Sequence, residues 1–160
     1  MIVHPLTAEE LANRTDLNDR GDIERLVVAF YRYAAMDEVL GPVFVAAHVN
    51  WPDHIDTLTD FWAWQLLGER GYVGNPLRAH EPIHERTPFS DVHYDRWLDL
   101  FVSTIDEYFV GPVAETAKGR ATKMAAAMRR LLDGQHGAPT EPTQAMWPTT
   151  PLDNEPRAKP

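Results

Sequence analysis

The sequence predicts an all-α protein, and three observations support this fold class. Apolar residues recur at offsets of three, four and seven in several stretches, which is the spacing of one face of a helix. No stretch alternates apolar and polar residues as a half-buried strand does. Glycine and proline separate the helical stretches. The length of 160 residues, of which 44% are hydrophobic and 24% charged, indicates one globular domain.

Residues 1–21 are expected to form an N-terminal extension. Thr7 and Glu10 have the spacing of a capping box, which predicts a short helix, but a loosely attached polar segment fits the composition equally well. The first long helix follows, with Asp19 or Asp22 as its cap. Its apolar face consists of Ile23, Leu26, Val27, Phe30, Tyr31 and Ala34. We expect Gly41-Pro42 to end this helical region.

The next helix is predicted to begin after Asn50, whose side chain can cap it, and to end at Gly68. The preceding residues, 44–49, are expected to be irregular. Within the helix, His54 and Leu58 are four residues apart, so they lie one above the other on a single face.

A short helical turn is predicted between two prolines. Asn75 can cap it, and Pro76 suits the first helical position. Pro82 cannot continue a helix because it has no N–H to donate, so only about one and a half turns fit before it. His80 lies at the end of this turn, and residues 81–89 are expected to form a loop.

Two further helices complete the predicted domain. Ser90 can cap the first, whose apolar face carries Trp97, Leu100, Phe101, Thr104, Ile105 and Tyr108. The last helix follows Gly111-Pro112 and stops at Gly134. The folded domain is therefore expected to span residues 22–133. Residues 134–160 are rich in Pro, Thr and Gln and are predicted to be a disordered tail.

Charge and composition exclude several classes of function. A net charge of −9, with Lys and Arg scattered along the chain, argues against nucleic acid or an anionic membrane as partner. The absence of Cys excludes a disulfide framework, a thiol nucleophile and a thiolate metal site. There is no apolar run of about 18 residues, and the first residues lack the features of a secretion signal. We therefore expect a cytoplasmic protein whose partners are small molecules or other proteins.

His80 is a candidate metal ligand. At the end of a short turn, its Nδ1–H can donate to the carbonyl of Pro76 or Leu77, which leaves Nε2 free to bind a metal. The alternative is a half-buried histidine without a function. His84 is four residues further on and could complete a non-haem metal site with a carboxylate, but Pro82 interrupts the helix between them. The spacing of His80 and His84 is therefore better explained by histidines on the surface.

Three aromatic residues with polar tips occupy core positions of separate helices: Tyr31, Trp62 and Trp97. Each hides a large apolar body and carries a donor that needs a partner when buried. These residues are either ordinary core residues or part of the lining of a polar pocket.

Several of these residues belong to motifs that resemble the group III truncated haemoglobins of bacteria. The motifs are Phe30-Tyr31, Gly41-Pro42-Val43-Phe44, Trp51 to His54, Phe61-Trp62, Leu67-Gly68, Tyr72-x-Gly74-x-Pro76-Leu77-x-x-His80 and Arg96-Trp97-Leu98-x-Leu100-Phe101. They occur in the family's order between about Asp22 and Leu132. The resemblance implies a two-over-two α-helical sandwich around haem b.

The resemblance also implies a role for individual residues. His80 matches the proximal iron ligand, and Tyr31, His54 and Trp97 match the distal ligand-binding residues. The haem pocket would further be lined by Phe44, Leu58, Trp62 and Leu77. His54 would gate ligand access, donate to the ligand or bind the iron itself, with the gate favoured.

The implied function is the binding of oxygen, nitric oxide or carbon monoxide at a five-coordinate iron. Two distal donors would slow the release of oxygen, which suits nitric oxide dioxygenase or peroxidase-like chemistry with an unidentified reductase better than oxygen transport. Two alternatives remain open. One is a haem-based sensor that acts on a protein partner through the extension or the tail, and the other is a helical protein with a non-haem metal at His80 and His84.

Overall fold

The computed structural model describes residues 7–133 of the chain. The tail predicted to be disordered, residues 134–160, and residues 1–6 of the predicted extension lie outside the described residues. The described helices are α1 (Ala8–Ala12), α2 (Arg20–Met36), α3 (Gly41–Ala46), α4 (Trp51–Leu67), α5 (Pro76–Arg86), α6 (Asp91–Tyr108) and α7 (Pro112–Asp133). Among the described residues, β pairing is limited to an isolated bridge between Thr15 and Phe109. The predicted all-α class is confirmed.

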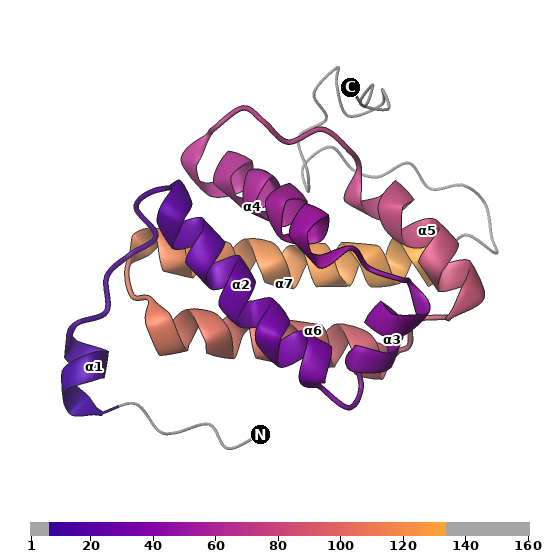
Figure 1. The fold of residues 1–160 in the computed structure, drawn as a ribbon, viewed down its shortest axis with the longest axis horizontal. Helices are drawn as coiled ribbons and strands as arrows, with labels where there is room; N and C mark the ends of the chain where they lie inside the picture. The colour runs from indigo at the N-terminus through magenta and orange to yellow at the C-terminus, as the bar shows by residue number, and fades with distance from the viewer. Residues whose placement is uncertain (1–6, 134–160) are drawn as a thin grey trace.

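The four long helices form two pairs. Helix α2 packs against α4, and α6 packs against α7. The pairs are joined because α2 also contacts α6 and α4 also contacts α7 (Figure 1). The core between them is apolar and includes the fully buried Leu26, Phe30, Phe101, Ile105 and Leu132. Helix α5, which follows α4 in the chain, packs on α7.

The helix starts follow the predicted caps. Asp19 accepts from the N–H of Asp22 at α2, and Asn50 accepts from the N–H of Asp53 at α4. Asn75 accepts from two N–H groups at the start of α5. Gly68 ends α4 with φ 69°, a left-handed conformation that favours glycine. Local side-chain chemistry therefore sets where the site-bearing helices begin and end.

The prediction that Gly41-Pro42 ends the helical region is wrong. Helix α2 has already ended at Met36, and Gly41 begins the short helix α3, which extends into the segment expected to be irregular. Pro42 lies in the first turn of α3, where an N–H has no helical partner and its loss costs nothing. The same dipeptide can therefore start a helix as well as stop one.

The predicted loop after Pro82 is also wrong, because α5 continues through Pro82 to Arg86. A proline inside a helix leaves the carbonyl four residues earlier without its N–H partner. That carbonyl belongs to Arg78, an exposed residue, so water can take the place of the missing donor. The continuation brings His84 onto the same helical face as His80.

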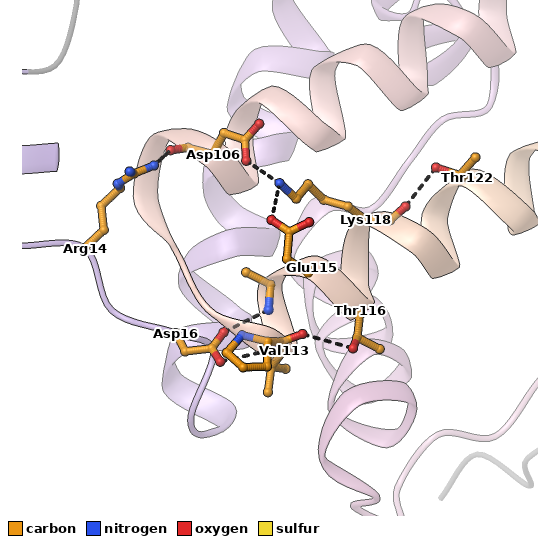
Figure 2. A network of polar contacts seen from close by, with 10 residues as sticks. Arg14, Asp16, Asp106, Val113, Glu115, Thr116, Lys118 and Thr122 are labelled. Atoms are coloured by element: carbon orange, nitrogen blue, oxygen red, sulfur yellow. Dashed lines mark hydrogen bonds and ion pairs between the residues drawn. The ribbon is translucent and has the colours of Figure 1, made fainter. Parts of the chain in front are cut away.

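The N-terminal extension is fastened to the junction between α6 and α7. Helix α1 has the predicted capping box between Thr7 and Glu10. Beyond it, Arg14 donates to the carbonyl of Asp106, and the Asp16 carboxylate accepts from two N–H groups in the first turn of α7 (Figure 2). Leu17 is fully buried in the main core. The extension therefore contributes side chains to the fold.

Candidate functional site

His80 is held by a hydrogen bond within α5. Its Nδ1 lies 2.5 Å from the carbonyl oxygen of Pro76, which can only accept, so Nδ1 carries the proton. This is the bond predicted from the spacing. Burial lowers the pKa of His80 below its ordinary value, although the bond to Pro76 acts in the opposite direction. The ring is therefore neutral, with the lone pair on Nε2.

His54 is carried by α4. Burial, and then the charge that His80 would carry, lower the pKa of His54 to about 4. Both imidazoles are therefore neutral at physiological pH. The Nε2 atom of His54 is buried and has no hydrogen-bond partner among the described residues.

Aromatic rings surround His54. Its ring centroid lies 5.0 Å from that of Tyr31, in an edge-on arrangement, and 6.5 Å from that of Phe44. Tyr31 and Phe44 are themselves in edge-on contact at 5.7 Å. Three of the predicted site residues, from α2, α3 and α4, thus form one cluster.

The Trp97 indole on α6 is within hydrogen-bonding reach of the Tyr31 phenol on α2. An indole N–H can only donate, so the Tyr31 oxygen accepts and the phenol proton remains available to another acceptor. Burial raises the pKa of Tyr31 far above its ordinary value, an effect that the bond from Trp97 only partly offsets. The phenol therefore keeps its proton.

The other predicted pocket residues take different places. Trp62 is 3% exposed and stacks on Phe101, which also stacks on Trp97, so Trp62 lies behind the cluster rather than beside His54. Leu77 is buried on α5, three residues before His80. Leu58 is partly buried against the core, one turn after His54 on α4.

Two aromatic residues near the histidines were not predicted to belong to the site. Trp51 contacts Tyr31, Phe44 and His54 with ring centroids 5.7, 5.3 and 5.9 Å apart. Its position three residues before His54, on the same face of α4, was the available signal. Phe89 contacts His80 and His84 with centroids 6.2 and 5.4 Å apart. It follows α5 in the chain, and no local pattern in the sequence indicates this contact.

The expectation that His84 lies on the surface is wrong, since it is 7% exposed. Its Nδ1 accepts from the N–H of Phe89 at 3.0 Å, so this histidine has a structural bond that closes the end of α5. Within residues 7–133, no three His, Cys, Asp or Glu side chains are grouped so that they could hold a metal ion. The arrangement gives no support to a non-haem metal site at His80 and His84.

Comparison with known proteins decides the family. No family model matches the chain. The group 3 truncated hemoglobin ctb of Campylobacter jejuni is 30% identical over 114 residues, which cover 69% of this chain and 87% of that relative. The chain belongs to the group III truncated haemoglobins. The crystal structure of group III truncated hemoglobin from Campylobacter jejuni matches this truncated haemoglobin with a TM-score of 0.68 and 27% identity, covering 78% of this chain and 98% of that one.

The residues of this truncated haemoglobin fit the haem that its family implies. A neutral imidazole with a free Nε2 is the usual proximal ligand of haem iron in globins, and His80 presents one. On α4, the ring of His54, whose Nε2 has no partner among the described residues, contacts Tyr31 and other aromatic rings. An apolar wall with a few polar groups is what a cofactor pocket requires. Among the described helices, none is long and apolar enough to cross a membrane.

Proposed function

We propose that this truncated haemoglobin holds haem b through Nε2 of His80 and binds a diatomic ligand on the side of Tyr31, His54 and Trp97. The observation that carries the proposal is the arrangement of the two histidines. The bond to Pro76 leaves Nε2 of His80 unprotonated, and Nε2 of His54 on α4 is buried without a hydrogen-bond partner among the described residues. When bound, the haem supplies an iron atom with one face open to oxygen, nitric oxide or carbon monoxide.

Tyr31 is the proposed donor to the ligand. Since Trp97 donates to the Tyr31 oxygen, the phenol proton is free to be donated and the phenol group is held in place. A hydrogen bond to a charged acceptor contributes about 1.5 to 3 kcal/mol, so it slows ligand release by about tenfold or more. Trp97 acts mainly by orienting Tyr31.

His54 is the proposed gate. Its pKa of about 4 keeps the ring neutral at physiological pH, so the ring can turn away from the ligand without moving a charge through an apolar space. Its ring contacts are with Tyr31, Phe44 and Trp51. Movement of the ring past these neighbours would open and close the route to the ligand side.

Slow ligand release favours a reaction of the ligand over its transport. We propose that oxygen and nitric oxide are combined to nitrate, with one electron from a reductase that is still to be identified, or that a hydroperoxide is cleaved with the help of the Tyr31 proton. We propose that Phe44, Leu58 and Leu77 line the haem pocket and that Trp62 packs behind them through Phe101. The proposed location is the cytoplasm.

The visible spectrum of the purified protein tests the cofactor and its ligand together. We expect a Soret band that is lost or shifted in His80→Ala and retained in His84→Ala, because His84 is engaged with the N–H of Phe89. Added imidazole should restore the band in His80→Gly. Far-ultraviolet circular dichroism of each variant controls for folding. A band unchanged in His80→Ala would refute the assignment of the ligand.

A further inference from the structure

A continuous series of aromatic rings leads away from the proposed ligand side. It begins at Tyr31 and Trp97, which share a hydrogen bond. Phe30 packs edge-on against both, with ring centroids 4.7 Å from Tyr31 and 5.8 Å from Trp97. The first rings of the series are therefore the residues proposed to act on the ligand.

Phe101 connects two indoles in the core. The ring of Trp97 stacks on Phe101 with centroids 5.2 Å apart and planes 7° apart. The ring of Trp62 also stacks on Phe101, at 4.8 Å and 23°. Stacked rings at this separation are in van der Waals contact. Contact between π-systems favours electron transfer, and the two indoles are one ring apart.

The series continues along α4 to the surface. Trp62 contacts Phe61 at 5.4 Å, and Phe61 contacts Tyr72 at 5.1 Å and Trp64 at 6.2 Å. Trp64 and Tyr72 stack on each other at 5.6 Å and 21°. Phe61 and Trp62 are buried, whereas Trp64 and Tyr72 are both partly exposed. The series thus joins the site to a stacked pair at the surface.

We propose that Trp64 and Tyr72 form a second reaction site, at which small phenols are oxidised by one electron while a hydroperoxide is reduced at the haem site. Tryptophan and tyrosine are the side chains that lose an electron most readily, so Trp97 and Trp62 relay the electron and the phenylalanines bridge between them. The proposal rests on the proposed function, because haem held by His80 is needed to reduce the hydroperoxide.

The reaction balances in atoms and electrons. Reduction of one molecule of hydrogen peroxide breaks its O–O bond and forms two molecules of water, which consumes two electrons and two protons. Each electron leaves the Trp64–Tyr72 pair through Trp62, and the oxidised ring releases a proton to solvent. A phenol then returns one electron and one proton to the ring and becomes a phenoxyl radical. Two phenols are consumed for each hydrogen peroxide.

Spin trapping tests where the oxidised rings form. The protein loaded with haem, as verified by its Soret band, is treated with hydrogen peroxide and a nitroso spin trap, digested and mapped by mass spectrometry. We expect the adducts on Trp64 and Tyr72. Tyr33 and Tyr108 are the internal controls: both are at least partly exposed, and Tyr108 packs on Phe109, outside the series. Adducts spread evenly over all four residues would overturn the proposal.

Two variants test the route and the end point. Phe101→Leu removes the ring between the indoles, and we expect the adducts on Trp64 and Tyr72 to be lost.

The double variant Trp64→Phe/Tyr72→Phe changes partly exposed residues, so it remains informative where the core variant does not fold. The double variant should lose phenol oxidation but retain the spectral change on addition of hydrogen peroxide. The control variant Tyr108→Phe should retain both phenol oxidation and the spectral change. Phenol oxidation that persists in the double variant refutes the second site. Failure to load haem refutes the proposed function instead.

Discussion

The hydrogen bond between Trp97 and Tyr31 has one direction, because the indole nitrogen can donate and cannot accept. At the level of residues, this leads us to propose a different role for Trp97. The sequence suggested two donors to the ligand, one from each side chain. In the proposed arrangement the indole proton is donated to the phenol oxygen, and the phenol proton is left for a ligand.

Tyr31→Phe should therefore raise the dissociation rate of oxygen by about tenfold or more, since a bond of about 1.5 to 3 kcal/mol is lost. Trp97→Phe should have a smaller effect that disappears when Tyr31 is already Phe, because its effect passes through the phenol. Stopped-flow measurement of ligand dissociation in both single variants and the double variant checks this. If Trp97→Phe has the same effect on the dissociation rate in the native protein and in Tyr31→Phe, then Trp97 donates directly to the ligand.

His54→Ala should speed the association of carbon monoxide and leave the ligand-free ferrous spectrum five-coordinate. The reason is that the imidazole fills space among Tyr31, Phe44 and Trp51, and its removal widens the route to the ligand side. Flash photolysis gives the association rate. A six-coordinate ferrous spectrum that is lost in His54→Ala would instead show that His54 binds the iron.

At the scale of elements, the caps were predictable and the behaviour of proline was not. Asp19, Asn50, Asn75 and Gly68 act on backbone groups within a few residues, so the sequence contains all that decides them. Pro82 carries the same local signal as a helix stop. Whether the helix continues depends on the tertiary contacts of His84 and Phe89, which no local pattern contains.

The contacts of the candidate site also divide into those that local sequence predicts and those that it does not. The bond from His80 to Pro76 spans four residues of one helix and was predicted from spacing. Helical periodicity likewise put His54 and Leu58 on one face. The Tyr31–Trp97 bond, by contrast, joins two helices, and the contact of Phe89 with His80 depends on how the segment after α5 folds back. Predicting these contacts requires the packing of the helices.

Asn75→Ala should weaken the hold on haem, because this side chain accepts from the N–H groups of Leu77 and Arg78 at the start of the helix that carries His80. Loss of an N-cap costs about 0.5 to 2 kcal/mol, and fraying of α5 would loosen the imidazole. Transfer of haem to excess apomyoglobin should be faster in Asn75→Ala. Thr7→Ala, which removes the cap of the distant α1, is the matched control and should leave the transfer rate unchanged.

At the scale of the whole molecule, the N-terminal extension and the α6–α7 junction form one unit. The N–H of Val110 donates to the carbonyl of Thr15 at 3.0 Å, and the Asp16 carboxylate accepts from Val113 and Ala114 at 3.0 and 2.8 Å. Gly111 has a φ of 145°, and a Cβ there would lie 2.4 Å from Asp16. The backbone passes too close to the carboxylate for a larger residue, so the contact constrains both segments.

The Asp16 contact should make the stability of the molecule depend on pH. Burial alone would raise the pKa of this carboxyl, but the N–H groups of Val113, Ala114 and Leu17 outweigh it and lower the pKa. A carboxyl with a lowered pKa stabilises the folded state above its unfolded pKa of about 3.9, and this contribution is lost as the pH falls through the folded value. Asp16→Asn should therefore lower the free energy of unfolding by about 0.3 to 1 kcal/mol at pH 7, the usual contribution of a carboxylate at a helix N-terminus. At an acidic pH below the folded pKa, where the native carboxyl is protonated too, variant and native protein should differ little. Urea unfolding at both values of pH measures this difference.

Asp106→Asn, which breaks an exposed pair with Lys118, is the control and should cost less at pH 7. A difference for Asp16→Asn that is equally large at both values of pH would mean that the charge has no part in the contact.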